Sequence, residues 1–133
     1  MGLVMGSALF ATVPKTDPLH FRTSEGTDFK KVAAFLKFDQ NDLSKISGVS
    51  KKSIRFDENI PADLRERLEQ ISTVCSLVAV YFDGDKHKTY QWFTLPNPML
   101  GGTKPRDMIR LGRYNKLLKF IVEAMQLNEA GPT

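Results

Sequence analysis

Few residues in this chain of 133 are suited to acid–base, metal or nucleophilic chemistry. The single cysteine, Cys75, stands inside an apolar run, which favours a buried, inert thiol over a nucleophile. The two histidines, His20 and His87, have polar or irregular neighbours, and no group of Cys, His and carboxylates has metal-ligand spacing. Gly101-Gly102 is followed by Thr-Lys, but the spacing of a Walker phosphate loop is absent. The sequence therefore predicts neither an enzyme nor a metal or cofactor site.

Basic residues are the remaining candidates, and they are unevenly distributed along the chain. Residues 28–57 hold seven basic against four acidic residues, net +3, and residues 86–133 hold eight against three, net +5. The segment 58–85 between them holds two basic against six acidic residues, net −4. A basic surface suits either phosphate backbones or an acidic protein. The charges alone do not choose between these partners.

The elements that must position these residues read as a series of helices. Hydrophobic content of 41% with 26% charged residues is ordinary for a globular protein. Apolar residues recur at helical spacing and nothing alternates for long with period two, so we expect an all-α fold. Seven helices are expected. The first is capped by Thr27 or Asp28, the next two cover Gln40 to Ser47 and Lys51 to Asp57, and a long fourth helix runs from Pro61 to about Phe82. A fifth is capped by Asp85, a short sixth starts at Pro105, and the last runs from Tyr114 to about Leu127.

The long helix from Pro61 carries two neighbouring apolar stripes. So wide an apolar surface must be covered on two sides, by the rest of the fold or by another copy of the chain. We expect a homodimer or higher oligomer that buries side chains such as Leu77 and Tyr81. Residues 1–27, with Pro14 and Pro18 among several Ser and Thr, are expected to form a loosely ordered, flexible arm.

Residues 39–55 match a helix-turn-helix over their full length. The motif needs an apolar residue for packing, a small residue where two helices cross, a turn glycine and two buried apolar residues. This sequence supplies all five, as Leu43, Ser44, Gly48, Val49 and Ile54.

In such a motif the second helix enters the major groove, and the first helix begins close to the DNA backbone. The predicted DNA-contacting residues are Gln40, Ser50, Lys51, Lys52, Ser53 and Arg55. For Lys51 and Lys52 the alternative is an ordinary solvated face. Asp57 and Glu58 add negative charge at the end of this helix, so DNA affinity is expected to be weak or to depend on dimerisation.

The segment 92–112 contains three prolines and three glycines, which set much of its backbone locally. Asn97-Pro98 and Gly101-Gly102 have turn chemistry. Pro105 suits the first position of a helix, and Gly112 suits the position that closes it. Taken alone, the segment can be a helix–turn–helix corner with no function.

The pattern Asn-Pro-x-Leu-Gly-Gly-x-x-Pro-x-Asp, from Asn97 to Asp107 with a glycine five residues later, resembles the toxin-binding domain of the Xre/MbcA/ParS antitoxins. These are the antidotes of bacterial toxin–antitoxin pairs, and their usual partner is a RES-domain toxin that consumes NAD. The resemblance covers about residues 30–127. It implies an arm (1–27), an Xre-like helix-turn-helix domain with a long connecting helix (28–84) and a small helical toxin-binding domain (85–133).

Family members lay this domain over the entrance of the toxin's active site. The resemblance implies that Asn97, Leu100, Gly101, Gly102, Pro105 and Gly112 shape the binding surface. To these we add basic residues able to meet an acidic rim of the toxin: Lys104, Arg106, Arg110, Arg113 and Lys116, with Lys119 beside them.

Two positions depart from the pattern. Lys104 stands where many relatives have Thr, and since lysine cannot accept a hydrogen bond, Asp107 is expected to satisfy the free N–H groups of the helix. Thr103 stands where a basic residue is common, which puts one contact in doubt. Trp92 and Phe93 are expected to divide between core and interface.

These observations predict an antitoxin of a type II system that covers the active site of a RES-type toxin and regulates its own operon by binding operator DNA. The alternative is a stand-alone helix-turn-helix transcriptional regulator. The apolar N-terminus lacks the basic region of a signal peptide, and no stretch reaches the ~18 apolar residues of a spanning helix. A cytoplasmic protein with no membrane partner is therefore expected.

Overall fold

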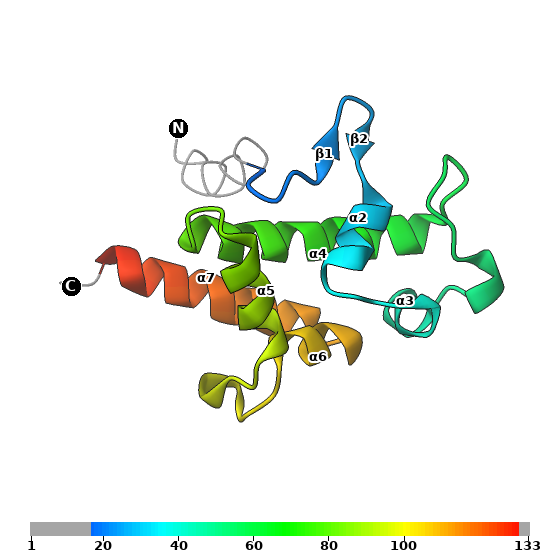
Figure 1. The fold of residues 1–133 in the computed structure, drawn as a ribbon. Coiled ribbons are helices and arrows are strands. Elements are labelled where there is room, and N and C mark those ends of the chain that lie inside the picture. Colours follow the sequence, from blue (N-terminus) through cyan, green and yellow to red (C-terminus); the bar gives the residue numbers. More distant parts are fainter. Residues whose placement is uncertain (1–16, 131–133) are drawn as a thin grey trace, which may run out of the picture.

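A computed structural model describes residues 17–130, and the side chains of residues 17–127. This part of the chain is mostly helical, as predicted, with one two-stranded antiparallel hairpin (Figure 1). The elements are β1 (Arg22–Thr23), β2 (Gly26–Thr27), α2 (Phe29–Phe35), α3 (Gln40–Ser47), the 3-10 helix η1 (Lys51–Ser53), α4 (Ala62–Tyr81), α5 (Lys86–Thr94), the 3-10 helix η2 (Pro98–Leu100), α6 (Pro105–Arg110) and α7 (Tyr114–Ala130).

The first two helices begin where their capping residues predict, and the second also ends at its predicted glycine. The Asp28 carboxylate accepts from the backbone N–H of Lys31 at 3.1 Å and caps α2. At α3, Asp39 and Asp42 form a reciprocal capping box, with bonds of 2.8 and 3.1 Å. Gly48 ends α3 in the left-handed conformation, with φ of 79°. Local chemistry therefore sets this part of the fold.

The helix predicted over residues 51–57 is wrong. A single 3-10 turn forms instead, and Ile54 is already extended, with φ of −70° and ψ of 117°. A run this short cannot repay the cost of nucleating a helix unless tertiary packing supports it. The Asp57 carboxylate also competes, because it accepts from the backbone N–H of Asn59 and from the Arg55 guanidinium. The second helix of a helix-turn-helix is therefore missing.

The 20-residue helix α4 is the centre of the fold and contacts α2, α3, α5 and α7 (Figure 1). Pro61 was predicted as the first helical residue, but it is the N-cap, and the helix begins at Ala62. The other helices bury nearly the whole apolar surface of α4. Leu77 is 3% exposed within a single chain, so its burial needs no second copy. Tyr81, at the last turn, is 58% exposed.

Residues 17–27 are packed against this core, which corrects the loosely ordered arm expected there; residues 1–16 lie outside the described part. Leu19 and Phe21 are each 1% exposed. The Asp17 carboxylate accepts from the backbone N–H groups of Phe21 and Arg22, both at 2.9 Å. Burial of two large apolar side chains and this short-range turn hold the segment in place.

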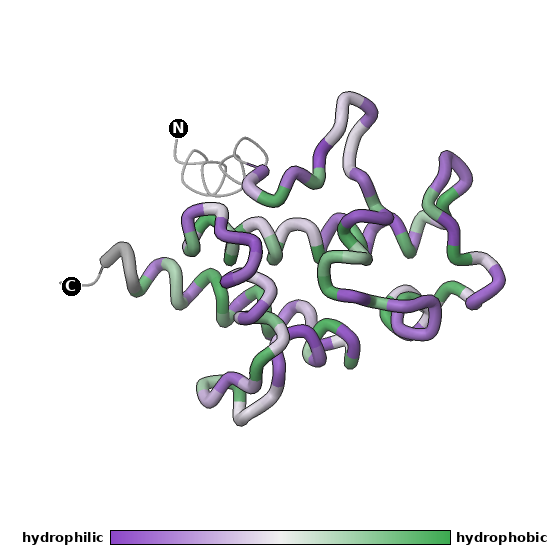
Figure 2. Tube along the Cα trace, viewed as in Figure 1, coloured by the Kyte–Doolittle hydropathy of each residue, from purple (hydrophilic) through white to green (hydrophobic). Residues whose placement is uncertain are grey.

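One continuous hydrophobic core runs from Leu19 to Ile121 and includes residues on both sides of the expected domain boundary at 84/85. Figure 2 shows hydrophobic positions recurring along α4 and α7, while α3 and α5 are mostly hydrophilic. No helix among the described residues has the length and apolarity needed to cross a membrane.

Candidate functional site

The loop between α5 and α6 is organised by Asn97. Its side-chain Oδ1 accepts from the backbone N–H of Met99 at 2.9 Å, which caps η2. Its backbone carbonyl accepts from the N–H groups of Leu100 and Gly102, both at 2.9 Å, and its own N–H donates to the carbonyl of Thr103 at 3.2 Å. Four hydrogen bonds thus converge on one residue and close the loop on itself.

Two consecutive glycines let this loop turn. Gly101 and Gly102 have φ of 68° and 82°, in the left-handed region that side chains disfavour. A Cβ at either position would meet nothing within 4 Å, so conformation and not crowding selects glycine. The resulting turn holds Met99 out from the surface, 78% exposed.

Helix α6 follows directly and is closed as predicted. Pro105 is its first residue. The N–H groups of Gly112 and Arg113 donate to the carbonyls of Ile109 and Met108 at 3.0 and 2.8 Å, which is a Schellman motif. The role expected of Asp107 is wrong. Its carboxylate accepts from Arg110 Nε at 3.3 Å and lies 3.8 Å from Arg106 Nη1, and it makes no cap with the helix N-terminus.

Arg106, predicted as a toxin contact, is partly buried and is held by contacts within the chain. Its Nε and Nη2 donate to the carbonyls of Leu36 and Lys37 at 2.6 and 2.9 Å. Its Nη2 also lies 3.5 Å from the Asp42 carboxylate, and its guanidinium stacks 4.7 Å from the ring centroid of Phe38. Arg106 therefore ties α6 to α2 and α3 and holds the loop before α6 in position.

The other predicted toxin contacts divide by exposure. Pro105 is buried, and Asn97, Leu100 and Arg110 are half-buried. The exposed members of the predicted set are Gly101, Gly102, Lys104, Gly112, Arg113 and Lys116.

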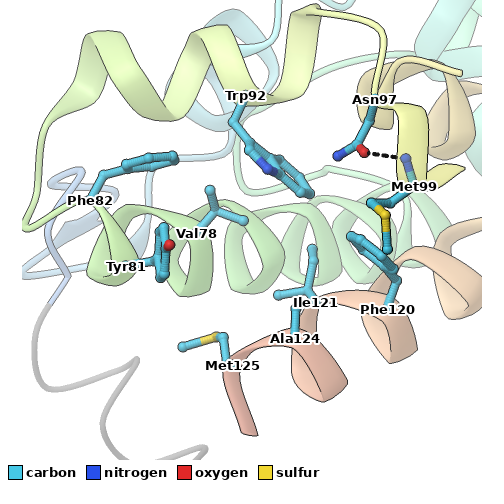
Figure 3. A pocket seen from close by; sticks show the side chains of 10 residues that line it. All are labelled: Val78, Tyr81, Phe82, Trp92, Asn97, Met99, Phe120, Ile121, Ala124 and Met125. Carbon is cyan, nitrogen blue, oxygen red and sulfur yellow. Dashed lines mark hydrogen bonds between the residues drawn. The ribbon is translucent and has the colours of Figure 1, made fainter. Parts of the chain in front are cut away.

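An apolar groove of about 250 Å³ lies beside the loop, between α4, α5 and α7 (Figure 3). Met99 and Asn97 form one end, and Tyr81 and Phe82 the other. The remaining wall residues are Val78, Trp92, Phe120, Ile121, Ala124 and Met125. Sequence analysis missed this groove, although the wide apolar stripe of α4 pointed to its Tyr81 end. Phe93 is fully buried in the core, while half-buried Trp92 lines the groove.

Gln40 begins α3, and the other predicted DNA contacts lie on or beside η1, after the opposite end of that helix. Gln40 and the residues of η1 are exposed, with Ser50 donating to the hydroxyl of Ser53 at 3.0 Å. Arg55 is paired bidentately with Asp57, at 2.8 and 2.5 Å. The hydrogen bond from Arg55 lowers the pKa of Asp57, and the same bond raises that of Arg55. Only Lys51 and Lys52 present unpaired cations on this described turn.

Cys75 is buried in the core as predicted, and burial raises the pKa of its thiol far above the usual value. Burial, with a smaller effect of Cys75, raises the pKa of the Tyr114 phenol to about 12. Both groups stay protonated at neutral pH. Neither is prepared for nucleophilic or acid–base chemistry.

Comparison with family models, with curated proteins and with solved structures gave no match. The site therefore has to be interpreted from its own geometry. The surface combines an apolar groove, an exposed methionine on a hydrogen-bonded loop and several exposed basic residues.

Proposed function

We propose that the chain is the antitoxin of a type II toxin–antitoxin pair, and that its C-terminal module binds and neutralises a RES-type, NAD-consuming toxin encoded beside it. The observation that carries the proposal is the structure of segment 97–112. It folds into a hydrogen-bonded loop and a helix closed by a Schellman motif, so hydrogen bonds within the chain set the conformation of the antitoxin-like pattern. A preorganised surface loses little conformational freedom on binding.

The electrostatics of this surface support a protein partner with an acidic rim. Of the fully exposed charged residues among positions 86–127, six are basic and one, Glu123, is acidic. Such an excess speeds encounter with an acidic partner and disfavours basic ones. The exposed basic residues are Lys86, Lys88, Lys104, Arg113, Lys116 and Lys119.

Neutralisation in this proposal is steric. The module covers the entrance of the toxin's active site and performs no chemistry on the toxin. Inhibition should therefore need stoichiometric amounts of antitoxin and reverse when the antitoxin is degraded.

The test is to co-express the adjacent reading frame with the full chain and to titrate NAD consumption by the purified toxin. Rescue of growth and a stoichiometric end point are expected. The variant Arg113→Glu should weaken the complex by under about 1 kcal/mol if the residue lies on a wet rim, and by a few kcal/mol if it is a buried anchor. The control Arg65→Glu reverses an exposed charge on α4 and should have no effect. Inhibition at well below stoichiometric amounts would contradict the proposal.

Regulation of the operon by DNA binding is a second part of the proposal, with narrower support. Lys51 and Lys52 are exposed on one turn and can reach phosphate groups. Without a helix to enter the major groove, base recognition has no supporting element at η1. Operator recognition therefore has to come from other residues or from assembly with the toxin.

A further inference from the structure

We propose that the groove between α4, α5 and α7 receives the apolar side chains of an acidic amphipathic segment of a partner protein. This inference deepens the function proposed above, since the partner would be the toxin. It names a contact that the sequence pattern does not contain, because most of the groove comes from α4 and α7.

The shape and lining of the groove fit apolar side chains from a peptide segment. Its volume of about 250 Å³ lies below the ~300–1,000 Å³ of typical small-molecule pockets. Its walls are aromatic and aliphatic, with Trp92 facing Ile121 across the groove (Figure 3). Met99 and Tyr81 remain largely exposed at the two ends. Tryptophan and tyrosine are the residues most enriched at interface hot spots, and methionine adapts to different partners.

Lysines flank both long walls of the groove. Lys88 precedes Trp92 by four residues on α5, and Lys116 precedes Phe120 by four on α7, so each lies one helical turn along the same face. Both are exposed, and no described carboxylate pairs with either. A peptide segment with apolar side chains and flanking carboxylates can bury its apolar side chains in the groove and pair its carboxylates with these lysines.

Nearby carboxylates do not cancel this basic rim. Asp85 is occupied as the cap of α5, where it accepts from the backbone N–H of Lys88 at 2.9 Å. Asp83 lines a different hollow, with Pro18 and His20. Glu123, seven residues after Lys116 on the same face of α7, is also exposed. On the described parts of α5 and α7, this one exposed carboxylate is outnumbered by four exposed lysines, namely Lys86, Lys88, Lys116 and Lys119.

Two other occupants fit less well. A second copy of the chain joined by a two-fold axis would face the same basic rim toward itself, which costs free energy. Single-stranded nucleic acid would satisfy the lysines, but base stacking needs flat, open aromatic platforms. In this groove the aromatic side chains alternate with Val78, Ile121, Ala124 and Met125, and Trp92 is only partly exposed.

Trp92 is the only tryptophan of the chain, so its fluorescence reports on the groove without labelling. The probe is a synthetic helical peptide of about twelve residues with Leu and Phe on one face and Asp and Glu on the other. Titrating it into the full chain should shift Trp92 emission to shorter wavelength and saturate. A peptide with Lys in place of the acidic residues, and one with Ser in place of the apolar residues, should each bind at least about tenfold more weakly.

Variants locate the binding. Ala124→Phe fills the groove and should abolish the shift, while Gln126→Phe adds the same side chain to an exposed position of α7 and should not. If Ala124→Phe does not fold, Met99→Glu provides the same test at a side chain that is 78% exposed, with Leu95→Glu, at 56%, as its control. Met99→Glu should weaken the acidic peptide about tenfold or more.

Three outcomes would overturn the proposal. These are equal binding of acidic and basic peptides, equal or tighter binding of an oligothymidylate, and a Trp92 shift that depends on protein concentration alone. The peptide assay contains no toxin, so the two hypotheses fail separately. Saturable acidic-peptide binding without neutralisation of the adjacent toxin rejects the antitoxin function and leaves the groove assignment intact. Neutralisation that Met99→Glu does not affect rejects the groove as the toxin contact.

Discussion

The guanidinium Nε of Arg106 donates to the backbone carbonyl of Leu36 at 2.6 Å, joining residues 70 positions apart in the sequence. Leu36 is the C-cap of α2, where a helix leaves carbonyl groups free and its dipole is negative. Arg106 satisfies that end and, from the first turn of α6, fixes the loop that carries Met99. The position of the candidate site thus depends on a contact with the N-terminal half of the fold.

Replacing Arg106 should destabilise the protein more than replacing an exposed arginine of the same module. Arg106→Ala removes charge-assisted hydrogen bonds from a part-buried site and should lower the free energy of unfolding by about 2–3 kcal/mol. Arg106→Lys keeps the charge but not the forked geometry of the guanidinium, so its stability should lie between those of the parent and Arg106→Ala. Urea denaturation measures both, with Arg113→Ala as a control expected to change stability by under about 0.5 kcal/mol. If Arg106→Ala does not change the free energy of unfolding, Arg106 does not stabilise the fold, and its role would be contact with a partner.

Asn97 should control partner binding through the loop. Asn97→Ala removes the acceptor for the Met99 N–H and should cost about 1 kcal/mol of stability, with a clear loss of affinity for the toxin. Asn97→Asp keeps an acceptor at the same place and should bind nearly as well as the parent. Calorimetry of the complex separates the two variants, and equal affinities for all three proteins would show that the loop does not contact the partner.

Stability should fall in acid partly through Asp39. The backbone N–H of Asp42, and to a lesser extent its side chain, lower the pKa of the Asp39 carboxyl below its usual value. A carboxyl whose pKa is lower in the folded state contributes stability above its unfolded pKa and loses it as the pH falls through the folded value. The melting temperature should therefore decline below about pH 4. In Asp39→Asn, which still caps α3, that decline should be smaller, and an identical pH profile would exclude Asp39 as a source.

Alkaline pH should destabilise the protein through Tyr114. Its pKa is raised from 10.0 to about 12, chiefly by burial and to a smaller extent by Cys75. Because the folded state favours the neutral phenol, its contribution is complete below the unfolded pKa and is lost as the pH rises from about 10 to 12. Ultraviolet titration of the three tyrosines should show one late ionisation, which Tyr114→Phe removes. Early titration of all three would show that Tyr114 is not shielded.

Any DNA affinity at η1 should lack sequence preference. Only the lysines of this turn are free, and phosphate contacts alone do not read bases. The duplex upstream of the gene and a shuffled duplex should bind with equal affinity, and both affinities should fall steeply as the salt concentration rises. In the double variant Lys51→Ala/Lys52→Ala, the slope of log affinity against log salt concentration should decrease by about one for each lysine that contacts a phosphate. If the upstream duplex is instead bound preferentially and these substitutions abolish that preference, the turn does take part in base recognition.

The starts and ends of most helices could be predicted from the sequence alone. Asp28, Asp39 and Asp85 cap helices through bonds to residues three positions later, and Gly48 and Gly112 end helices because their backbones are left-handed. These are interactions over less than two helical turns, so the local sequence contains all the groups involved.

Three features depended on tertiary structure. The turn at Lys51 could be helical or not by its local pattern, and Ile54, directly after it, packs against the core in an extended conformation. Arg106 looked like a surface arginine because its acceptors lie 70 residues away. The groove was not predictable because α4, α5 and α7 each contribute one wall. Apolar periodicity in a sequence shows that a helix face will be covered, but which element covers it, and where a gap is left, is decided by how the helices pack.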